Sequence, residues 1–454
     1  MSFPRYPAYR HSGFDWLGDL PAHWTVTRLK RDTVFVTSGA RGWAENYSDD
    51  GDLFLRIGNL TRTSISLDLS DIQRVSVEIG SEGARTQVRA GDVLFSITAY
   101  LGSVAVVPEG IGTAYVSQHV ALVRLNQKQF RPDWVAYVAS SYVGKTYLET
   151  QGYGGTKIQL SLGDVANLLV TSPPLVEQRA LTRFLDRETA KIDALVEEQK
   201  RLIELLKEKR QAVISQGVTK GLDPNVQMKD SGVEWLGEVP AHWDVSSIKR
   251  IVSTAVTDGP HETPNFPDEG IPFVSAEAVS SGVLDFEKKR GYISPEDHQR
   301  YSLKYRPRRG DIYMIKSGAT TGVTAIVETD EDFNIWSPLA VIRCAAECDP
   351  YFVLNFMRSR NFLESVTLNW SFGTQQNIGM GVIGNLAVPI PSAREQGHIA
   401  AYLSGVTCRI DALTHEAQKA IQLLQERRTA LISAAVTGKI DVRGLVQQPA
   451  AMTA

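Results

Sequence analysis

The chain has 454 residues, which is enough for two to four domains with packed cores. Its formal net charge of −3 argues against a protein that holds nucleic acid by a uniformly basic surface, but basic residues can still gather on one face. Three cysteines are too few for a disulfide framework, and no apolar run is long enough to span a membrane. We therefore expect a cytoplasmic protein without membrane contact.

The first recognisable segment is one half of an internal repeat. Residues 15–31 read DWLGDLPAHWTVTRLKR, and residues 234–250 read EWLGEVPAHWDVSSIKR. Trp16 and Trp235 are 219 positions apart. A tandem duplication therefore determines the architecture of the chain.

The segments that follow repeat more loosely. The string GDVLFSITAYLGSVAVV at 91–107 returns as GDIYMIKSGATTGVTAIV at 310–327. Short runs rich in Val, Ile, Phe and Tyr, separated by Gly, Asp and Pro, are typical of strands. Residues 130–148 and 349–369 favour helices, with a proline near each start. Each half thus predicts a mixed α+β domain.

A long helix is predicted at the end of each half. Residues 177–217 contain no proline and no internal glycine, and their IDAL at 192–195 returns at 410–413 in the stretch 395–438. Such helices have about 40 residues and are about 60 Å long. Steps of three and four residues indicate heptad seams, so we predict an antiparallel coiled coil and a pseudo-two-fold tandem repeat. The predicted seams are Ile192, Leu195, Gln199, Leu202, Leu206, Lys209 and Val213 in the first helix, and Ile410, Leu413, Ala417, Ala420, Leu424, Arg427 and Leu431 in the second.

These patterns divide the chain into six parts. The predicted parts are a domain at 1–174, a helix at 175–220, a linker at 221–232, a domain at 233–390, a helix at 391–440 and a disordered tail at 441–454.

Motifs for chemistry are mostly missing. Gly144, Lys145 and Thr146 lack the upstream glycine of a phosphate-binding loop, since position 139 is Ala. Cys344 and Cys348 lack the further ligands of a zinc site. No Asn/Asp-Pro-Pro-aromatic motif is present, because DPYF at 349–352 has one proline. We therefore predict no catalytic, cofactor or metal site in this chain.

The repeated PAHW segments contain the most tempting histidines, His23 and His242. A general base is one interpretation. We prefer a structural one, in which the tryptophan packs into the base of the domain and the histidine caps or hydrogen-bonds a turn.

The two halves differ in loops rich in side chains that read base edges or hold phosphates. Glycine-rich loops at 151–161 and 369–379 combine aromatics with long polar side chains. The alternatives are ordinary solvated loops and buried turns. The DNA-binding candidates are Arg41, Trp43, Asn59, Arg62, Tyr153, Lys157 and Gln159 in the first half, and His261, Lys316, Thr320, Thr321, Gln375, Gln376 and Asn377 in the second.

Apolar residues also lie outside the predicted seams. Ile203, Leu205, Ile421 and Leu423 are predicted to form a surface for partner subunits, with simple domain packing as the alternative.

This layout resembles the specificity (S) subunit of type I restriction–modification systems over nearly the whole chain. The resemblance rests on the WLGxxPxHWxxxxxKR openings, the strings at 91–107 and 310–327, and the exits GT…PPLVEQ and GT…PSAREQ into the IDAL-containing helices. It implies two target recognition domains, each reading one half of an asymmetric bipartite site in double-stranded DNA. The helices would set the gap between the halves.

The resemblance also implies partners. Two modification (M) subunits that bind S-adenosylmethionine would assemble on the helices and domains and methylate adenine. Two restriction (R) subunits that use ATP and Mg would be able to join them. The S subunit itself would be non-catalytic and would carry no cofactor.

Two other classes of protein stay open at this point. One is a coiled-coil scaffold or adaptor with duplicated protein-binding domains and no DNA role. The other is a methyltransferase or nuclease contained in a single chain, against which the missing motifs argue.

Overall fold

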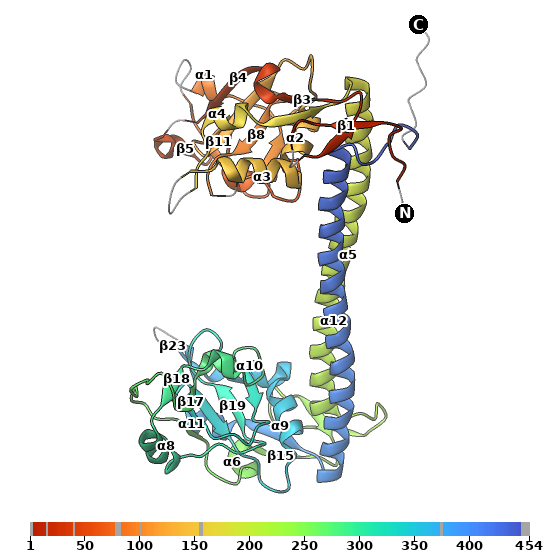
Figure 1. The fold of residues 1–454 in the computed structure, drawn as a ribbon. Coiled ribbons are helices and arrows are strands. Elements are labelled where there is room, and N and C mark those ends of the chain that lie inside the picture. Colours follow the sequence, from red (N-terminus) through yellow and green to blue (C-terminus); the bar gives the residue numbers. More distant parts are fainter. Residues whose placement is uncertain are drawn as a thin grey trace. The chain divides into compact units, whose positions relative to one another are not determined.

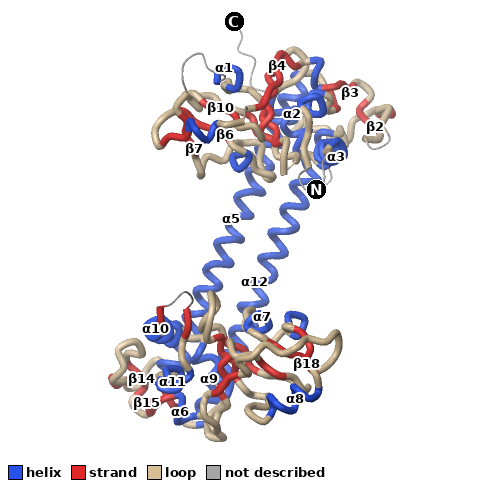
Figure 2. The backbone as a smooth tube through the Cα atoms, turned by 90° about the vertical axis from the view of Figure 1, so that its left-hand side faces the viewer, coloured by secondary structure: helices blue, strands red, loops and turns tan. Residues whose placement is uncertain are grey.

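The computed structural model describes residues 3–14, 17–39, 41–77, 83–99, 101–153, 158–372 and 376–445. It divides into two compact units, Met1–Gln199 with Lys419–Ala454, and Lys200–Gln418. Each unit contains one domain of short strands and helices together with part of each of two long helices (Figures 1 and 2). The predicted α+β tandem repeat with two long helices is confirmed.

The first domain is built on two four-stranded sheets of orders β4-β11-β8-β9 and β10-β6-β7-β5. In the second sheet β10 lies parallel to β6, while the ladders of the first sheet are antiparallel. Two further pairs, β1-β2 and β3-β12, complete the strands. The strands are β1 (Tyr9–His11), β2 (Asp19–Pro21), β3 (Thr25–Arg28), β4 (Thr33–Ser38), β5 (Tyr47–Ser48), β6 (Asp52–Leu55), β7 (Gln73–Val75), β8 (Val93–Ser96), β9 (Val104–Val106), β10 (Ala114–Val116), β11 (Val120–Leu125) and β12 (Leu169–Ser172). The helices are α1 (Gly83–Thr86), α2 (Pro132–Ser140), α3 (Tyr142–Gln151) and α4 (Leu162–Ala166), with 3-10 turns η1 (Leu29–Arg31), η2 (Trp43–Asn46) and η3 (Ile57–Asn59).

The second domain repeats this plan. Its sheets have the orders β16-β22-β19-β20 and β18-β17-β21, and β15 pairs with β25 as β3 pairs with β12. The strands are β13 (Met228–Asp230), β14 (Glu238–Pro240), β15 (Asp244–Ser247), β16 (Thr257–Asp258), β17 (Ile271–Val274), β18 (Gly291–Ile293), β19 (Ile312–Ile315), β20 (Thr324–Ile326), β21 (Asn334–Ile335), β22 (Leu339–Ile342), β23 (Ser371–Phe372), β24 (Gln376–Asn377) and β25 (Ala387–Ile390). The helices are α6 (Ile248–Ile251), α7 (Ala276–Val279), α8 (Pro295–Ser302), α9 (Pro350–Met357), α10 (Arg360–Asn369) and α11 (Met380–Asn385), with the 3-10 turn η4 (Phe286–Lys288).

A buried tryptophan of the PAHW segment lies in the core of each domain. Trp24 is fully buried and meets Trp134 of α2 edge to face, with ring centroids 5.9 Å apart. Trp243 is also fully buried and meets Phe352 of α9 in the same way at 6.3 Å. Because large aromatic rings bury much apolar area, these pairs fix how α2 and α9 pack in their domains.

The long helices are α5 (Leu175–Lys220) and α12 (Ala393–Val436), and they pack antiparallel within each unit (Figure 1). In the first unit Asp193 Oδ1 lies 3.3 Å from Arg428 Nε, and in the second Arg210 Nε lies 2.9 Å from Asp411 Oδ1. These two ion pairs occupy equivalent positions of the internal repeat. None of the helices in the described ranges is long and apolar enough to cross a membrane.

The predicted seams are correct at alternate positions, beginning with Ile192 and Ile410, and wrong at most of the positions between them. Leu195, Leu202, Lys209, Leu413 and Arg427 are exposed rather than buried. The faces turned inward instead carry Ile192, Val196, Gln199, Ile203, Leu206 and Arg210 on α5, and Ile410, Thr414, Ala417, Ile421, Leu424 and Arg428 on α12. Starting from Ile192, steps of four then three residues and steps of three then four residues each give a continuous stripe along one side of the helix. Packing against the partner helix decides which stripe is buried.

Candidate nucleic-acid and partner interfaces

The repeated histidine–tryptophan pair anchors each domain to the start of a long helix. Glu177 in the first turn of α5 accepts hydrogen bonds from Trp24 Nε1 at 3.1 Å and pairs with His23 Nε2 at 2.8 Å. In the second unit Glu395 of α12 accepts from Trp243 Nε1 at 3.0 Å and lies 3.0 Å from His242 Nε2. The histidines therefore have a structural role, as preferred from the sequence, but their partner is a helix-start carboxylate and not a turn.

The glutamine after each of these glutamates makes a second anchor. Gln178 accepts a hydrogen bond from Arg131 N and donates to Pro173 O, both at 2.9 Å. Gln396 accepts from Asp349 N at 2.8 Å and donates to Pro391 O at 2.9 Å. Since a buried amide with both ends satisfied resists rotation, each long helix leaves its domain in a fixed direction.

One buried carboxylate organises the cations of the second domain. Asp258 of β16 is fully buried, and its Oδ1 accepts a hydrogen bond from Lys304 Nζ at 2.6 Å. Its Oδ2 lies 3.3 Å from Lys316 Nζ and 3.0 Å from His261 Nε2, but it accepts no hydrogen bond of good geometry. Burial alone raises the pKa of Asp258, yet the hydrogen bond and charge of Lys304 and the charge of Lys316 lower it below its ordinary value. Asp258 therefore stays ionised and gathers a cluster with excess positive charge.

Four predicted residues of the second domain lie beside this cluster. Gly318 N donates to Gln376 O at 3.0 Å, and Ile378 N donates to Lys316 O at 2.9 Å, so the loop after β19 is joined to the β23–β24 hairpin. Thr320, Gln376 and Asn377 are exposed there. Thr321 is half-buried, and its hydroxyl donates to Gly318 O within the loop. Gln375 lies outside the described residues.

The first domain presents a different, uncharged network. Tyr153 and Gln159 form a backbone bridge, and Gln159 also bridges to Thr98. The Thr98 hydroxyl lies 3.0 Å from His119 Nδ1, and Gln118 Nε2 lies 3.0 Å from His119 Nε2. Sequence reasoning missed Gln118 and His119, because they sit in a short turn between strands that resembles an ordinary connection.

The other predicted residues of the first domain do not join this network. Arg41 is exposed in the turn before η2, and Lys157 lies outside the described residues. Arg62 is exposed, and its carbonyl accepts from Lys145 Nζ at 3.4 Å. Burial, followed by the charges of Arg62 and Arg428, lowers the pKa of Lys145. Arg62 therefore belongs to a basic cluster beside α12.

One prediction for this domain needs correction, and another concerns a side chain that is largely buried. Asn59 is only 3% exposed, and its amide accepts from Arg56 N and donates to Asp68 O and Asp71 O. Those bonds close a turn, so Asn59 has no free group with which to read a base. Trp43 is only 7% exposed and stacks on Phe54 with centroids 5.0 Å apart, so it lies in the wall of the domain and not on an exposed loop, and its role in DNA binding stays a prediction.

Leucines stand out from both long helices in equivalent places. Leu195 and Leu423 are exposed in the first unit, and Leu413 and Leu205 are exposed at the equivalent positions of the second. Leu205 and Leu423 thus lie where a partner can reach them, as predicted. The same prediction is wrong for Ile203, which is buried between the helices, and for Ile421, which is half-buried there.

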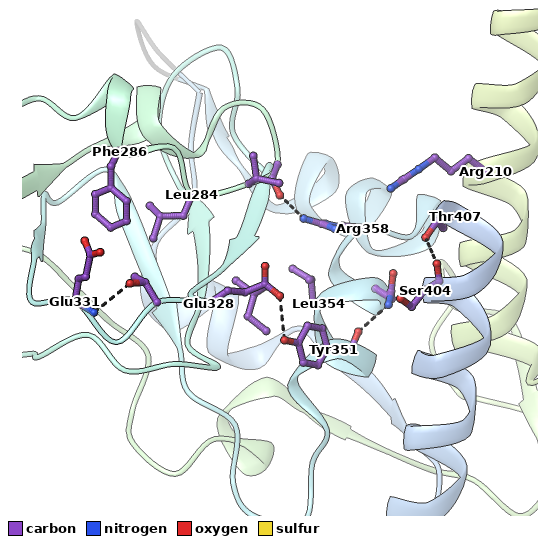
Figure 3. A pocket seen from close by; sticks show the side chains of 15 residues that line it. Arg210, Leu284, Phe286, Glu328, Glu331, Tyr351, Leu354, Arg358, Ser404 and Thr407 are labelled. Carbon is purple, nitrogen blue, oxygen red and sulfur yellow. Dashed lines mark hydrogen bonds between the residues drawn. The ribbon is translucent and has the colours of Figure 1, made fainter. Parts of the chain in front are cut away.

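A hollow of about 480 Å³ lies where the second domain meets the long helices (Figure 3). Arg210 reaches toward it from α5, Ser404 and Thr407 from α12, and Tyr351 and Arg358 from the domain. Arg358 Nη2 donates to Thr324 O at 3.0 Å, and Gln211 Nε2 donates to Arg358 O at 2.9 Å. The bond from Gln211 ties α5 to the domain, and burial followed by the charge of Arg210 lowers the pKa of Arg358.

Among the described residues, no group of three or more His, Cys, Asp or Glu side chains is arranged to hold a metal ion. Burial, followed by the charges of Cys348, Asp349 and Asp311, raises the pKa of Cys344 to about 12, so its thiol is a poor metal ligand at neutral pH.

Two copies of one mixed domain, anchored to the same two helices and differing in their exposed loops, define a duplicated recognition scaffold. Residues 47–205 and 240–423 match the family model of the type I restriction modification DNA specificity domain, and the chain belongs to this family. Its two domains are DNA specificity domains, which makes the scaffold alternative the less favoured one.

Relatives of similar length support this assignment. A putative type I restriction enzyme MjaX specificity subunit from Methanocaldococcus jannaschii is 21% identical over 446 residues, which cover 94% of this chain and 96% of the relative. The type I restriction enzyme EcoKI specificity subunit from Escherichia coli K12 is 20% identical and covers 95% of this chain, with 92% of its own length matched.

Solved structures share the fold. A chain from a study of complex assembly and conformational transition in the type I R-M system superposes with a TM-score of 0.71 at 19% identity, over 92% of this chain and 98% of that one. The HsdS subunit from Thermoanaerobacter tengcongensis gives a TM-score of 0.52 at 18% identity, over 93% and 98% of the two chains.

Proposed function

We propose that this chain is the subunit that selects the DNA sequence for a type I restriction–modification complex and that each domain reads one half of an asymmetric bipartite site. The observation that carries the proposal is the contrast between the two domains. Their anchors repeat at equivalent positions, with Glu177 matching Glu395, whereas their exposed groups differ in chemistry. The second domain presents cations around Asp258, and the first presents the neutral network of Thr98, Gln118 and His119.

Different chemistry at the two surfaces favours different half-sites. Lysine side chains bind phosphates and guanine edges, whereas glutamine and threonine make neutral hydrogen bonds to base edges. The lysines around Asp258 also offer local attraction to phosphates that does not depend on sequence, in a chain whose net charge is −3.

The leucines on the helices support docking of two identical partners. Leu195 and Leu423 in the first unit, and Leu413 and Leu205 in the second, are exposed at equivalent positions of the repeat. A repeated surface on one chain suits two copies of the same partner. We assign these surfaces to two M subunits, which would bring S-adenosylmethionine and methylate adenine. Two R subunits with ATP and Mg would join when the complex restricts DNA, and this chain would contribute no catalytic group.

The test is assembly and DNA binding with the M subunit from the same system. The wild-type complex is expected to bind one bipartite duplex better than duplexes with either half scrambled, and to do so with a strong salt dependence. No sequence preference in the assembled complex would refute the proposal and favour a scaffold.

The partner surface is tested by Leu205→Glu and Leu423→Glu, each of which places a charge on an exposed apolar patch. They are expected to weaken M binding without unfolding the chain. The matched control is Leu303→Glu, because Leu303 is 90% exposed on the second domain and not on a long helix. Equal M binding by all three variants would exclude the leucine surfaces as the docking site.

A further inference from the structure

A second hollow, of about 280 Å³, opens in the first domain next to Gln118 and His119. One side is aromatic and the other is polar. Its principal lining residues are Trp43, Tyr47, Phe54, Arg56, Ser117 and His119. Trp43 stacks on Phe54, while Tyr47 is 46% exposed at the rim. A flat aromatic wall facing hydrogen-bonding groups suits a flat ligand with polar edges.

Two polar groups in the wall of this hollow have no partner among the described residues. Ser117 is 6% exposed, and its hydroxyl is buried without a hydrogen bond. Arg56 Nε is also buried without one, although Arg56 Nη2 donates to Asp71 Oδ2 at 3.0 Å. Because buried polar groups are nearly always paired, an unpaired donor beside a cavity points to a ligand that completes it. Rotation about the Cα–Cβ bond of Ser117 moves its hydroxyl to another staggered position, so the hydroxyl can turn toward a ligand.

The second domain shows that the fold itself does not require this hollow. Val116 of β10 pairs with Leu55, and Ile335 of β21 pairs in parallel with Val274 at the equivalent place. The residue that follows is Ser117 in the first domain and Trp336 in the second.

Trp336 fills space that the small serine leaves open. Its ring lies 6.5 Å from that of Phe273, the counterpart of Phe54, and the guanidinium of Arg290 lies over it at 5.3 Å. The small residue that lines this hollow is therefore particular to the first domain and is not part of the repeated scaffold.

We propose that this hollow receives a single nucleobase, turned out of the DNA helix at the first half-site. The inference rests on the proposed function, since it requires the first domain to bind DNA. Stacking on an aromatic side chain accepts any base, and hydrogen bonds to the exposed edge of the base then distinguish one base from another. Tyr47 supplies the stacking surface, and Ser117 and Arg56 supply the hydrogen bonds.

The experiment uses the full chain assembled with its M subunit, and duplexes mispaired at one position at a time through the first half-site. Mispairing lowers the cost of turning a base out, so binding should tighten about tenfold at the position whose base enters the hollow. Ser117→Trp, which copies the second domain, should abolish that gain. Any gain that persists in Ser117→Trp belongs to a base held elsewhere, such as the adenine held by M.

Three controls keep the result interpretable. Ser117→Ala leaves the hollow open and should keep the tightening while weakening overall discrimination at that position. Unchanged preference of Ser117→Trp for the second half-site shows that the variant is folded and assembled. Free nucleosides, added one at a time without DNA, test for a soluble ligand through the fluorescence of Trp43.

The outcomes separate the two proposals. Intact sequence preference with no mispaired position sensitive to Ser117→Trp overturns the base-binding inference alone. Binding of a free nucleoside without any such position also overturns it, in favour of a small-molecule site. Loss of all sequence preference in the wild-type complex overturns both the inference and the proposed function.

Discussion

The anchor between each domain and its long helix yields a matched pair of variants, Glu177→Ala and Glu395→Ala. Glu177 is 6% exposed and accepts hydrogen bonds from the Tyr6 hydroxyl and Trp24 Nε1, besides pairing with His23. Its removal leaves two buried donors without an acceptor. At about 1–3 kcal/mol for each unsatisfied buried group, the first unit should lose about 2–6 kcal/mol.

The second anchor should matter less. Glu395 accepts one hydrogen bond from a buried group, that of Trp243 Nε1, while its other partner, His242, is 54% exposed in the side chain. Water replaces the lost contact of an exposed histidine, so Glu395→Ala should cost about 1–3 kcal/mol.

Amide hydrogen exchange measures each unit separately, which matters because a chain of two units need not unfold in one step. Exchange in β3 and β12 reports on the first unit, and exchange in β15 and β25 reports on the second. Glu177→Ala should speed exchange in the first pair more than Glu395→Ala speeds it in the second. An equal or larger effect of Glu395→Ala would refute the reasoning from buried donors.

Three further predictions concern charge, pH and helix length. Asp258→Asn removes the carboxylate that holds Lys304 and Lys316. Binding to unrelated DNA at low salt should then rise, while preference for the second half-site in competition binding should fall about tenfold. Unchanged preference would show that Asp258 does not position these cations. Burial, followed by the charges and hydrogen bonds of Tyr313 and Asp311, raises the pKa of Tyr305, so the folded protein keeps this phenol protonated. Its contribution to stability is present below pH about 10, where the unfolded phenol also keeps its proton, and is lost as the pH rises above that value. The thermal unfolding temperature of the wild type should therefore fall more steeply with pH than that of Tyr305→Phe between about pH 9 and 11. Equal slopes of unfolding temperature against pH would contradict the raised pKa of Tyr305. Deleting 198–204 together with 417–423 keeps the ion pairs Asp193–Arg428 and Arg210–Asp411 in register and shortens each helix by about 10 Å. Genome-wide mapping of methylated bases should then show a gap between the half-sites that is shorter by about three base pairs. Changed half-site bases would contradict a ruler role for the helices.

The architecture was predictable because duplication leaves a record that one sequence can show. The PAHW and IDAL strings recur at nearly constant offsets, and long stretches of helix-forming residues without proline specify α5 and α12. The faces of these helices that turn inward were not predictable, because a stripe that begins at Ile192 can continue in steps of three then four residues or of four then three. Contact with the other helix selects Val196 over Leu195 and Thr414 over Leu413.

The site was predictable in residue type more than in position. Thr320, Gln376 and Asn377 are exposed and lie with Lys316 in one region of the second domain, although they come from two segments. Asn59 failed because an asparagine closes a turn as readily as it reads a base. Asp258 was missed because a single carboxylate in a strand has no signature until folding brings Lys304 and Lys316 to it. Glu177 was missed for the same reason, since His23 is 154 positions away.

The central claim is that this chain selects the DNA sequence at which its partners act. Mapping methylated adenines across the host genome, with and without the gene for this chain, tests it most directly. We predict one asymmetric bipartite motif, methylated when the gene is present and unmethylated when it is deleted, and restored by returning the gene. An unchanged set of methylated motifs after deletion would contradict the claim.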